Sequence, residues 1–378
     1  MALVKPDVAR FAKIKVLGIG GGGSNAINTM VFEDLIAGVD FVAINTDAQA
    51  LLANQAGIKL QIGENLTRGL GVGGNPEIGS QSAEESREKI KEMLADTDMV
   101  FITAGMGGGT GTGASPIIAE IAKEQGALTI AVVTKPFLFE GTRRMVAAEE
   151  GIVKLKDKVD ALIVIPNQKL LDSIDRKITL VEAFKTVDSV LAQGVHGISD
   201  IITLPGLINR DFADIKSIMK DAGSAFMGIG VGIGENRAQA GARNAIASPL
   251  LEVSINGARG ILFTITGGSD LTMAEVEEAS KIITENADAD ANIIFGASID
   301  QKMVDQIKVS VIATGFDESK LNLRRMVQPP AAKVFSTASP TTKTSTPGGN
   351  GETDTEAPLD EMGEEYEVPA FLRLGRQH

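Results

Sequence analysis

Two glycine-rich stretches, each directly after a short apolar run, contain the residues of this sequence best suited to chemistry. Residues 18–25 read Gly-Ile-Gly-Gly-Gly-Gly-Ser-Asn, and residues 105–113 read Gly-Met-Gly-Gly-Gly-Thr-Gly-Thr-Gly. Glycine leaves backbone N–H groups free to converge on an anion, and a helix that begins there adds the positive end of its dipole. Thr110 and Thr112 add hydroxyl donors. The second stretch therefore predicts a cradle for a polyphosphate, with a flexible glycine hinge as the alternative.

The first stretch also fits a different nucleotide. Gly18, Gly20 and Gly23 satisfy the G-x-G-x-x-G pattern, and Asp47, after the next apolar run, could bind a ribose. The alternative is therefore a nicotinamide-dependent oxidoreductase. It leaves the second stretch unexplained, because one pyrophosphate does not need two glycine loops, whereas a nucleoside triphosphate could use both. The second stretch is not the common P-loop, since it contains no lysine and no Gly-Lys-Ser/Thr follows.

Two further pairs of residues stand at helical spacing. Phe184 and Asp188 are one turn apart and share a helix face. A carboxylate there can accept from the N1–H and amine of guanine, and the ring can stack on the base; core packing of Phe184 and a solvated face at Asp188 are the alternatives. Asp211 and Asp214 fit an N-cap and an acidic first-turn residue.

The elements that position these residues follow from the apolar pattern. Continuous apolar runs that alternate with helical stretches predict a parallel sheet covered on both faces, with strands at 14–17, 41–44, 99–102, 128–133 and 161–165 and helices at 82–94 and 117–123. A three- and four-residue apolar period predicts a long amphipathic helix over 180–202 that ends near Pro205 and Gly206. A second, α+β module spans 223–316, with strands at 261–265, 291–295 and 307–312 and a helix at 275–284.

Composition excludes several classes of site. The 378 residues include no cysteine, and the two histidines are His196 and His378, so disulfides, metal–thiolate centres and histidine clusters are excluded. A Ser-His-Asp triad would depend on His196 alone. The net charge of −13 argues against nucleic acid as a partner. No apolar run is long enough to span a membrane, and the N-terminus lacks a signal peptide, so we expect a cytoplasmic protein.

Residues 107–113 resemble the signature loop of the tubulin/FtsZ GTPases, and the arrangement over about 12–316 resembles the cell-division members of that family. The resemblance implies an α/β fold with a Rossmann-like parallel-sheet GTPase domain and a long central helix. The implied order is a flexible leader 1–11, a GTP-binding domain 12–179, the central helix 180–205, a catalytic loop with its following helix 206–222, a C-terminal α+β domain 223–316, a disordered linker 317–366 and a partner-binding tail peptide 367–378.

The resemblance also implies which residues bind GTP and GDP. Residues of the glycine loops would face the phosphates and ribose, and Asn45 to Asp47 would form the γ-phosphate side. Glu140 and Arg144 would contact the ribose. Asn167, Phe184 and Asp188 would read the base. The full set is Gly21, Gly22, Gly23, Ser24, Asn25, Asn45, Thr46, Asp47, Gly107, Gly108, Gly109, Thr110, Gly111, Thr112, Thr134, Pro136, Glu140, Arg144, Asn167, Phe184 and Asp188.

Catalysis is implied to be shared between subunits. In the family, the loop after the central helix inserts into the nucleotide pocket of the next subunit of a head-to-tail filament. Asn209, Asp211 and Asp214 would orient and polarise the attacking water, and Mg²⁺ would sit on the phosphates rather than on a protein metal site. Arg210 stands where the family usually has an apolar residue; it could pair with Asp211, reach the γ-phosphate side or face solvent. The alternative function is a structural filament that does not hydrolyse GTP.

The last residues resemble the family's tail motif. Residues 328–358 are rich in Pro, Thr, Ser, Ala and Gly, which predicts a disordered linker. The peptide after it would dock on membrane-tethering division proteins through Val368, Pro369, Phe371, Leu372 and Arg373. This predicts a protein localised to a ring at the division site, beneath the inner membrane; a frayed terminus is the alternative.

Overall fold

The computed structural model describes residues 12–32, 36, 38–173, 178–203, 211–248, 250–251, 255, 257–301 and 303–316. The predicted leader, linker and tail peptide lie outside these residues, as do Asn209, Arg210 and the predicted helix end at Pro205 and Gly206. In the described part, no helix combines the length and hydrophobicity that crossing a membrane requires.

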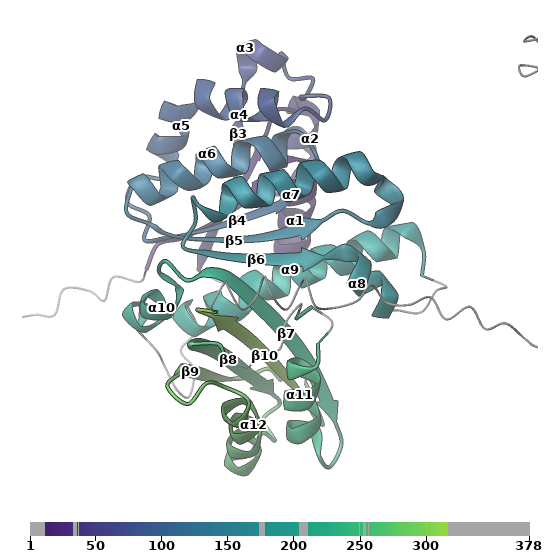
Figure 1. Cartoon of the computed structure of the whole chain (residues 1–378), viewed down its shortest axis with the longest axis vertical. Coiled ribbons are helices and arrows are strands. Elements are labelled where there is room, and N and C mark those ends of the chain that lie inside the picture. The colour runs from purple at the N-terminus through teal and green to yellow at the C-terminus, as the bar shows by residue number, and fades with distance from the viewer. Residues whose placement is uncertain are drawn as a thin grey trace, which may run out of the picture. The chain divides into compact units, whose positions relative to one another are not determined.

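Six parallel strands form the N-terminal half of one sheet (Figure 1). Their order is β3 (Ile58–Gln61), β2 (Val39–Asn45), β1 (Ile14–Ile19), β4 (Met99–Gly105), β5 (Leu128–Lys135) and β6 (Ala161–Pro166). The five strands predicted from apolar runs are confirmed as β1, β2, β4, β5 and β6. The prediction omitted β3, because this short edge strand is largely exposed and contains Lys59 and Gln61.

The sheet continues into the C-terminal half. β7 (Gly223–Ile233) pairs with β6 in parallel over three residue pairs, from Ala161–Gly223 to Ile163–Ala225. β10 (Gln306–Thr314) lies antiparallel between β7 and β8 (Gly260–Gly267), and β9 (Asn292–Ile299) completes the edge parallel to β8. The result is a mixed ten-stranded sheet, and the three strands predicted here correspond to β8, β9 and β10.

β7 escaped prediction because alternate residues are glycine. Added Cβ atoms would lie 2.1 Å from Ala245 O at Gly228, 2.2 Å from Ala245 N at Gly230 and 1.8 Å from Arg237 O at Gly232. The backbone of α11 (Arg237–Ile246) therefore packs directly on this strand. The same glycines that this contact requires remove the apolar alternation by which a strand is recognised.

Helices cover both faces of the N-terminal sheet. α1 (Gly20–Phe32) and α9 (Leu180–Thr203) contribute to one core with Val16 and Phe101, whereas α5 (Arg87–Met93), α6 (Thr110–Glu124) and α7 (Thr142–Lys156) contribute to the other with Leu17 and Ile102. Adjacent strand residues thus enter opposite cores, which explains the continuous apolar runs. The first core also takes in Leu262, Ile294 and Ile312 of the C-terminal strands, so the predicted long helix, α9, serves both halves.

The remaining helices are short or belong to the C-terminal half. α12 (Met273–Glu285) contains the predicted helix 275–284 and packs with α11. The predicted single helix 82–94 is wrong: α4 (Pro76–Glu85) ends and α5 begins at Ser86, whose backbone leaves helical geometry and whose hydroxyl accepts from Gly63 N–H at 3.2 Å. The others are α2 (Ala48–Ala53), α3 (Glu64–Thr67), a 3₁₀ turn at Leu138–Glu140, α8 (Asn167–Ser173) and α10 (Phe212–Met219).

Gly113 is expected to be indispensable for stability, unlike Gly197. A Cβ at Gly113 would lie 1.9 Å from Pro76 O and 2.7 Å from Ser80 N, because α6 packs backbone to backbone on α4. Gly113→Ala should lower the free energy of unfolding by about 2–3 kcal/mol. At Gly197, in α9, a Cβ would lie 3.8 Å from Ser310 Cβ, which is an ordinary contact. Gly197→Ala should therefore raise the free energy of unfolding by up to ~1 kcal/mol. Urea denaturation measures both, and equal effects would contradict this account.

Candidate functional site

The two glycine loops meet at the carboxyl ends of neighbouring parallel strands. The first follows β1 and opens α1 at Gly20, and the second follows β4 and opens α6 at Thr110. A Cβ on Gly20, whose φ is +71°, would lie 2.8 Å from Gly111 N, and one on Gly22 would lie 3.1 Å from Gly105 N. The loops therefore touch through their backbones, and the N-termini of both helices open on the same space.

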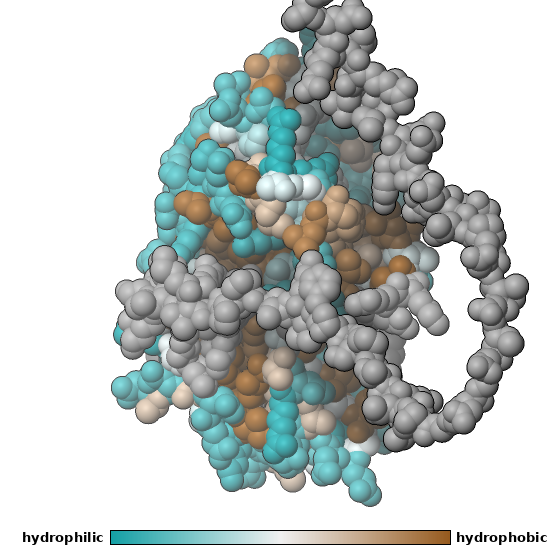
Figure 2. Space-filling view, turned by 45° about the vertical axis from the view of Figure 1, so that its right-hand side comes forward, coloured by the Kyte–Doolittle hydropathy of each residue, from teal (hydrophilic) through white to brown (hydrophobic). Residues whose placement is uncertain are grey.

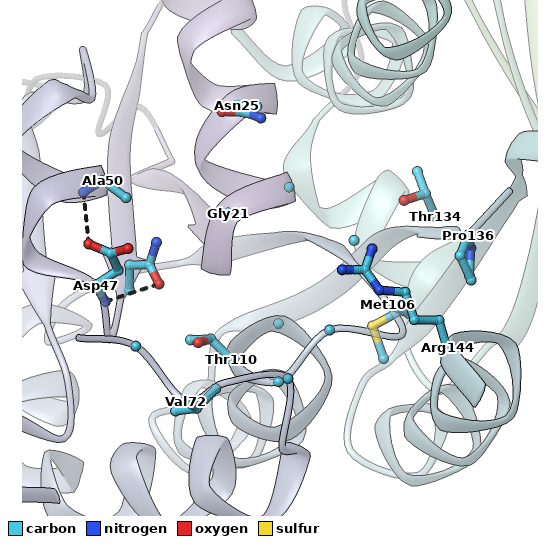
Figure 3. Close-up of a pocket in the computed structure, with 18 of the residues that line it drawn as sticks. Gly21, Asn25, Asp47, Ala50, Val72, Met106, Thr110, Thr134, Pro136 and Arg144 are labelled. Carbon is cyan, nitrogen blue, oxygen red and sulfur yellow. Dashed lines mark hydrogen bonds between the residues drawn. The ribbon is translucent and has the colours of Figure 1, made fainter. Parts of the chain in front are cut away.

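That space is a cavity of about 630 Å³, a volume suited to a small-molecule ligand. In Figure 3, Asp47 lies at one side and Thr134, Pro136 and Arg144 at the other, with Gly21 and Thr110 between them. Most residues predicted from the resemblance line the cavity: Gly21, Gly22, Asn25, Asn45, Thr46, Asp47, Gly108, Gly109, Thr110, Gly111, Thr134, Pro136, Glu140, Arg144, Asn167, Phe184 and Asp188.

Four predicted residues, Gly23, Ser24, Gly107 and Thr112, do not line the cavity. Gly23 lets α1 approach β4, since a Cβ there would lie 2.4 Å from Thr103 O. Ser24 is buried, and its hydroxyl finds no hydrogen-bond partner among the residues that the structure describes. Gly107 N–H donates to Thr112 Oγ1 at 2.8 Å, so this threonine closes the second loop on itself. The sequence showed that these polar groups were present but not which way they point.

A third glycine loop was missed. Residues 70–74 line the cavity, and Gly71, Gly73 and Gly74 have φ of +77°, +58° and +79°. Val72 packs against the second loop, because a Cβ on Gly109 would lie 2.2 Å from Val72 Cγ2. The run Gly-Leu-Gly-Val-Gly-Gly at 69–74 was the available signal. Gly105 and Met106 line the cavity as part of the stretch predicted to be the cradle, whereas Ala50, Val187 and Leu191 line it without having been predicted.

One wall of the cavity is fixed by short polar contacts. The hydroxyls of Thr46 and Thr110 are 2.7 Å apart, which joins the end of β2 to the start of α6. Asn45 Oδ1 accepts from Thr46 N–H at 2.9 Å. Asp47 caps α2, because its Oδ1 accepts from Gln49 N–H at 2.9 Å and from Ala50 N–H at 3.1 Å, the second of which is drawn in Figure 3. These contacts fix the threonine hydroxyls, the Asn45 amide and the Asp47 carboxylate beside the glycine loops.

The opposite wall combines a charged pair with aromatic rings. Glu140 pairs with Arg144 one helical turn later, and its Oε1 accepts from Phe137 N–H at 3.0 Å. Phe137 is 1% exposed, and its ring stands edge-on to Phe184 at 5.4 Å between centroids. Phe184 itself is 41% exposed and lines the cavity, so it is not simply a core residue.

Two polar side chains at this wall have no hydrogen-bond partner in the described part of the chain. Asn167, the first residue of α8, is buried, and its Oδ1 accepts no hydrogen bond. Burial raises the pKa of the Asp188 carboxyl to about 7. Because no described residue satisfies either group, both fit a ligand with N–H donors at this end of the cavity.

The two predicted catalytic carboxylates that the structure describes lie elsewhere. Asp211 stands at the N-cap position of α10, but its side chain accepts no capping hydrogen bond, and Asp214 is in the first turn. Neither lines the cavity. His196 does not line it either and pairs with Asp200 through Nδ1 at 2.7 Å.

Comparisons with known proteins agree with this geometry. Residues 13–175 match the GTPase domain of the Tubulin/FtsZ family, and residues 223–317 match the C-terminal domain of the FtsZ family. An empty FtsZ dimer from M. jannaschii is 48% identical over 81% of this chain and 89% of its own, with a TM-score of 0.78. A GDP-bound CetZ1 monomer from Haloferax volcanii shares the fold at 20% identity, over 81% of this chain and 94% of its own, with a TM-score of 0.69.

The fold and the cavity thus define a tubulin-like GTPase. With both family matches and the 48% identity, the chain belongs to the FtsZ family. This membership decides between the two nucleotides that the sequence left open, and the ligand is GTP rather than a nicotinamide dinucleotide.

Gly108→Ala is expected to weaken GTP binding without loss of stability. A Cβ at Gly108 meets no atom within 4 Å, so the methyl group extends into open space at a residue that lines the cavity. The Kd for GTP should rise about tenfold, the size of a typical overpacking penalty. Gly57→Ala, also in open space but outside the cavity, is the matched control. Isothermal titration and thermal unfolding measure the two quantities. Gly109→Ala should instead lower stability, because of the Val72 contact.

Proposed function

We propose that the cavity binds GTP with its phosphates on the glycine loops and its base beside Asp188, and that hydrolysis is completed by the neighbouring subunit of a head-to-tail filament. Asn209, Asp211 and Asp214 of one subunit would reach the γ-phosphate side of the next. The M. jannaschii FtsZ relative was solved as a dimer, which supports self-association. Filaments of this kind would build the ring at the division site.

The observation that carries this proposal is the lack of an unengaged acid near the loops. Among the described residues, the cavity contains three carboxylates, those of Asp47, Glu140 and Asp188. Asp47 caps α2, Glu140 holds Arg144 and a backbone N–H, and Asp188 lies at the aromatic wall. The two acids that follow the long helix are outside the cavity and are not used for capping. A second subunit can supply them to the site, whereas their own subunit does not.

Exposed apolar side chains around the cavity favour such an assembly. Hydrophobic residues are visible at several points of the surface in Figure 2. Leu70, Leu138 and Phe139 are exposed on loops that border the cavity. A monomer gains nothing from exposing such side chains beside a polar ligand, but an interface would bury them.

Mg²⁺ is proposed to accompany the nucleotide. The described residues contain no group of three or more acidic, His or Cys side chains that could hold a metal ion. The phosphates would therefore supply most of its ligands, with waters completing the shell. Its contribution would be to neutralise charge on the phosphates during transfer.

The segments outside the described residues have proposed roles of their own. The leader 1–11 and the linker 317–366 would act as flexible connections, and the peptide 367–378 would bind membrane-tethering division proteins through Val368, Pro369, Phe371, Leu372 and Arg373. Domain 12–179 would bind GTP, the stretch 180–222 would carry the base-side residues and the catalytic loop, and domain 223–316 would complete the subunit. With these roles, the protein would act in the cytoplasm at the division site.

Mixing two inactive variants tests the shared site. Asp211→Ala should bind GTP normally and hydrolyse it poorly, and Asp214→Ala should behave alike. Gly108→Asp, which puts a negative charge beside the phosphates, should not bind. In mixtures, the intact pocket of one variant meets the intact loop of the other, so phosphate release should return and rise more steeply than protein concentration. Wild-type turnover by Asp211→Ala alone, or turnover per subunit that does not depend on concentration, would contradict the proposal.

The affinity for nucleotide should depend on pH through Asp188. Guanine N–H donors require the ionised carboxylate, and its pKa in the free protein is raised to about 7. Protons therefore compete with the nucleotide below this value, and the Kd for GDP should be about tenfold weaker at pH 6 than at pH 8. Asp188→Asn should bind more weakly and lose this dependence, while any effect of phosphate ionisation remains in both proteins. Titration calorimetry at several pH values decides, and an unchanged pH profile in Asp188→Asn would show that the base is read elsewhere.

A further inference from the structure

The turn at residues 137–140 is held by two side chains. Phe137 N–H donates to Glu140 Oε1 at 3.0 Å, and Leu138 N–H donates to Gln168 Oε1 at 3.3 Å. The first bond is internal to the turn. The second bond comes from α8 and ties the turn to another element. Gln168 does not line the cavity, so it is not itself placed to touch the nucleotide.

The hydrogen bonds of Gln168 fit an amide side chain. Its Nε2 donates to Asp172 Oδ1 at 2.9 Å, one turn later in α8. A carboxylate can only accept, so the amide nitrogen faces Asp172 and the amide oxygen faces Leu138 N–H. Gln168 thus accepts from a peptide N–H and donates to a carboxylate at the same time, which an uncharged amide of this length can do.

This bond connects the two sides of the nucleotide wall. Gln168 follows Asn167, whose buried Oδ1 lacks a partner. Leu138 follows Phe137, whose ring stands at 88° to that of Phe184. The same turn ends in Glu140, which holds Arg144 on the sugar side. A shift of the turn relative to α8 would therefore change the spacing between the base-side and sugar-side residues.

We infer that Gln168 is a positioning residue for nucleotide recognition. It fixes the turn 137–140 against α8 and so sets where Phe184 and Arg144 stand relative to Asn167. This inference rests on the proposed role of these residues around the base and sugar. It adds a residue that acts through them and touches no ligand.

Gln168→Leu removes both hydrogen bonds at similar side-chain volume. The KM for GTP and the Kd for GDP should each rise about fivefold, because the neutral hydrogen bond that ties Leu138 N–H to α8 is lost together with its support from Asp172. The kcat at saturating GTP should not change, because the glycine loops and the neighbour's carboxylates are untouched. Lys169→Leu, at the adjacent exposed position of α8, is the matched control and should leave both parameters unchanged.

A residue swap separates positioning from simple loss of structure. Asp172→Asn keeps an acceptor for Gln168 and should have normal KM. Gln168→Glu loses the donor, faces Asp172 with like charge and should raise KM. In the double variant, the new amide at position 172 can donate to the new carboxylate at position 168, which still accepts from Leu138 N–H. The double variant should therefore recover the wild-type KM, which a general loss of stability would not allow.

Asp188→Asn serves as the reference for the pocket itself. Suppose that Asp188→Asn weakens GTP binding, but Gln168→Leu leaves the KM unchanged or lowers only the kcat and the thermal midpoint. The inference about Gln168 is then wrong, and the assignment of the pocket stands. Failure of the double variant to recover KM also overturns the inference. If Asp188→Asn has no effect on binding, the base-side assignment is wrong and the role of Gln168 falls with it.

Discussion

The backbone contact between the two glycine loops is the constraint on which the site depends. β1 and β4 are parallel neighbours, so their carboxyl ends bring the loops together. A Cβ on Gly20 would lie 2.8 Å from Gly111 N, so no side chain fits between the loops. Because α1 and α6 both begin at this contact, their free N–H groups and dipole ends face one cavity. One loop would suffice for a single phosphate. Two adjoining loops match a chain of phosphates.

The long helix α9 determines what stands at the other end of that cavity. Phe184 and Asp188 lie in its first turns, and further along the chain Gly197 O accepts from Thr264 Oγ1 of β8 at 3.3 Å. The residues assigned to the base are thus carried by the helix that also packs against the C-terminal strands. Partial burial disfavours the ionised form of the Asp188 carboxyl and raises its pKa to about 7. A ligand that donates to it removes that penalty, so binding should add stability.

The sequence predicted what continuous apolar runs and glycine spacing reveal, and it failed where packing alone decides. Five parallel strands, α9 and the loops at 18–25 and 105–113 were predicted because their local patterns are strong. β7 was not, since the glycines that admit α11 remove its apolar alternation. The loop 70–74 was visible as a glycine run, but only the packing of Val72 on Gly109 brings it to the cavity. Thr112 was predicted to bind GTP, and the sequence alone did not indicate that its hydroxyl also accepts from Gly107 N–H within the same loop.

The proposed separation of acids from the cavity has an electrostatic reason. A carboxylate about 4 Å from a phosphate costs roughly 1–4 kcal/mol at surface-like dielectric values. Fixed in the same subunit, Asp211 and Asp214 would oppose binding of the polyphosphate at every encounter. If a neighbouring subunit supplied these two carboxylates, their repulsion would oppose assembly instead. The net charge of −13 on each chain would add to that repulsion. In the proposed filament, assembly would therefore need an opposing attraction, which the exposed Leu70, Leu138 and Phe139 would provide at the rim and the proposed Mg²⁺ would provide on the phosphates. Under the proposed mechanism, the acid that activates water would arrive only with a neighbouring subunit, so hydrolysis would follow assembly.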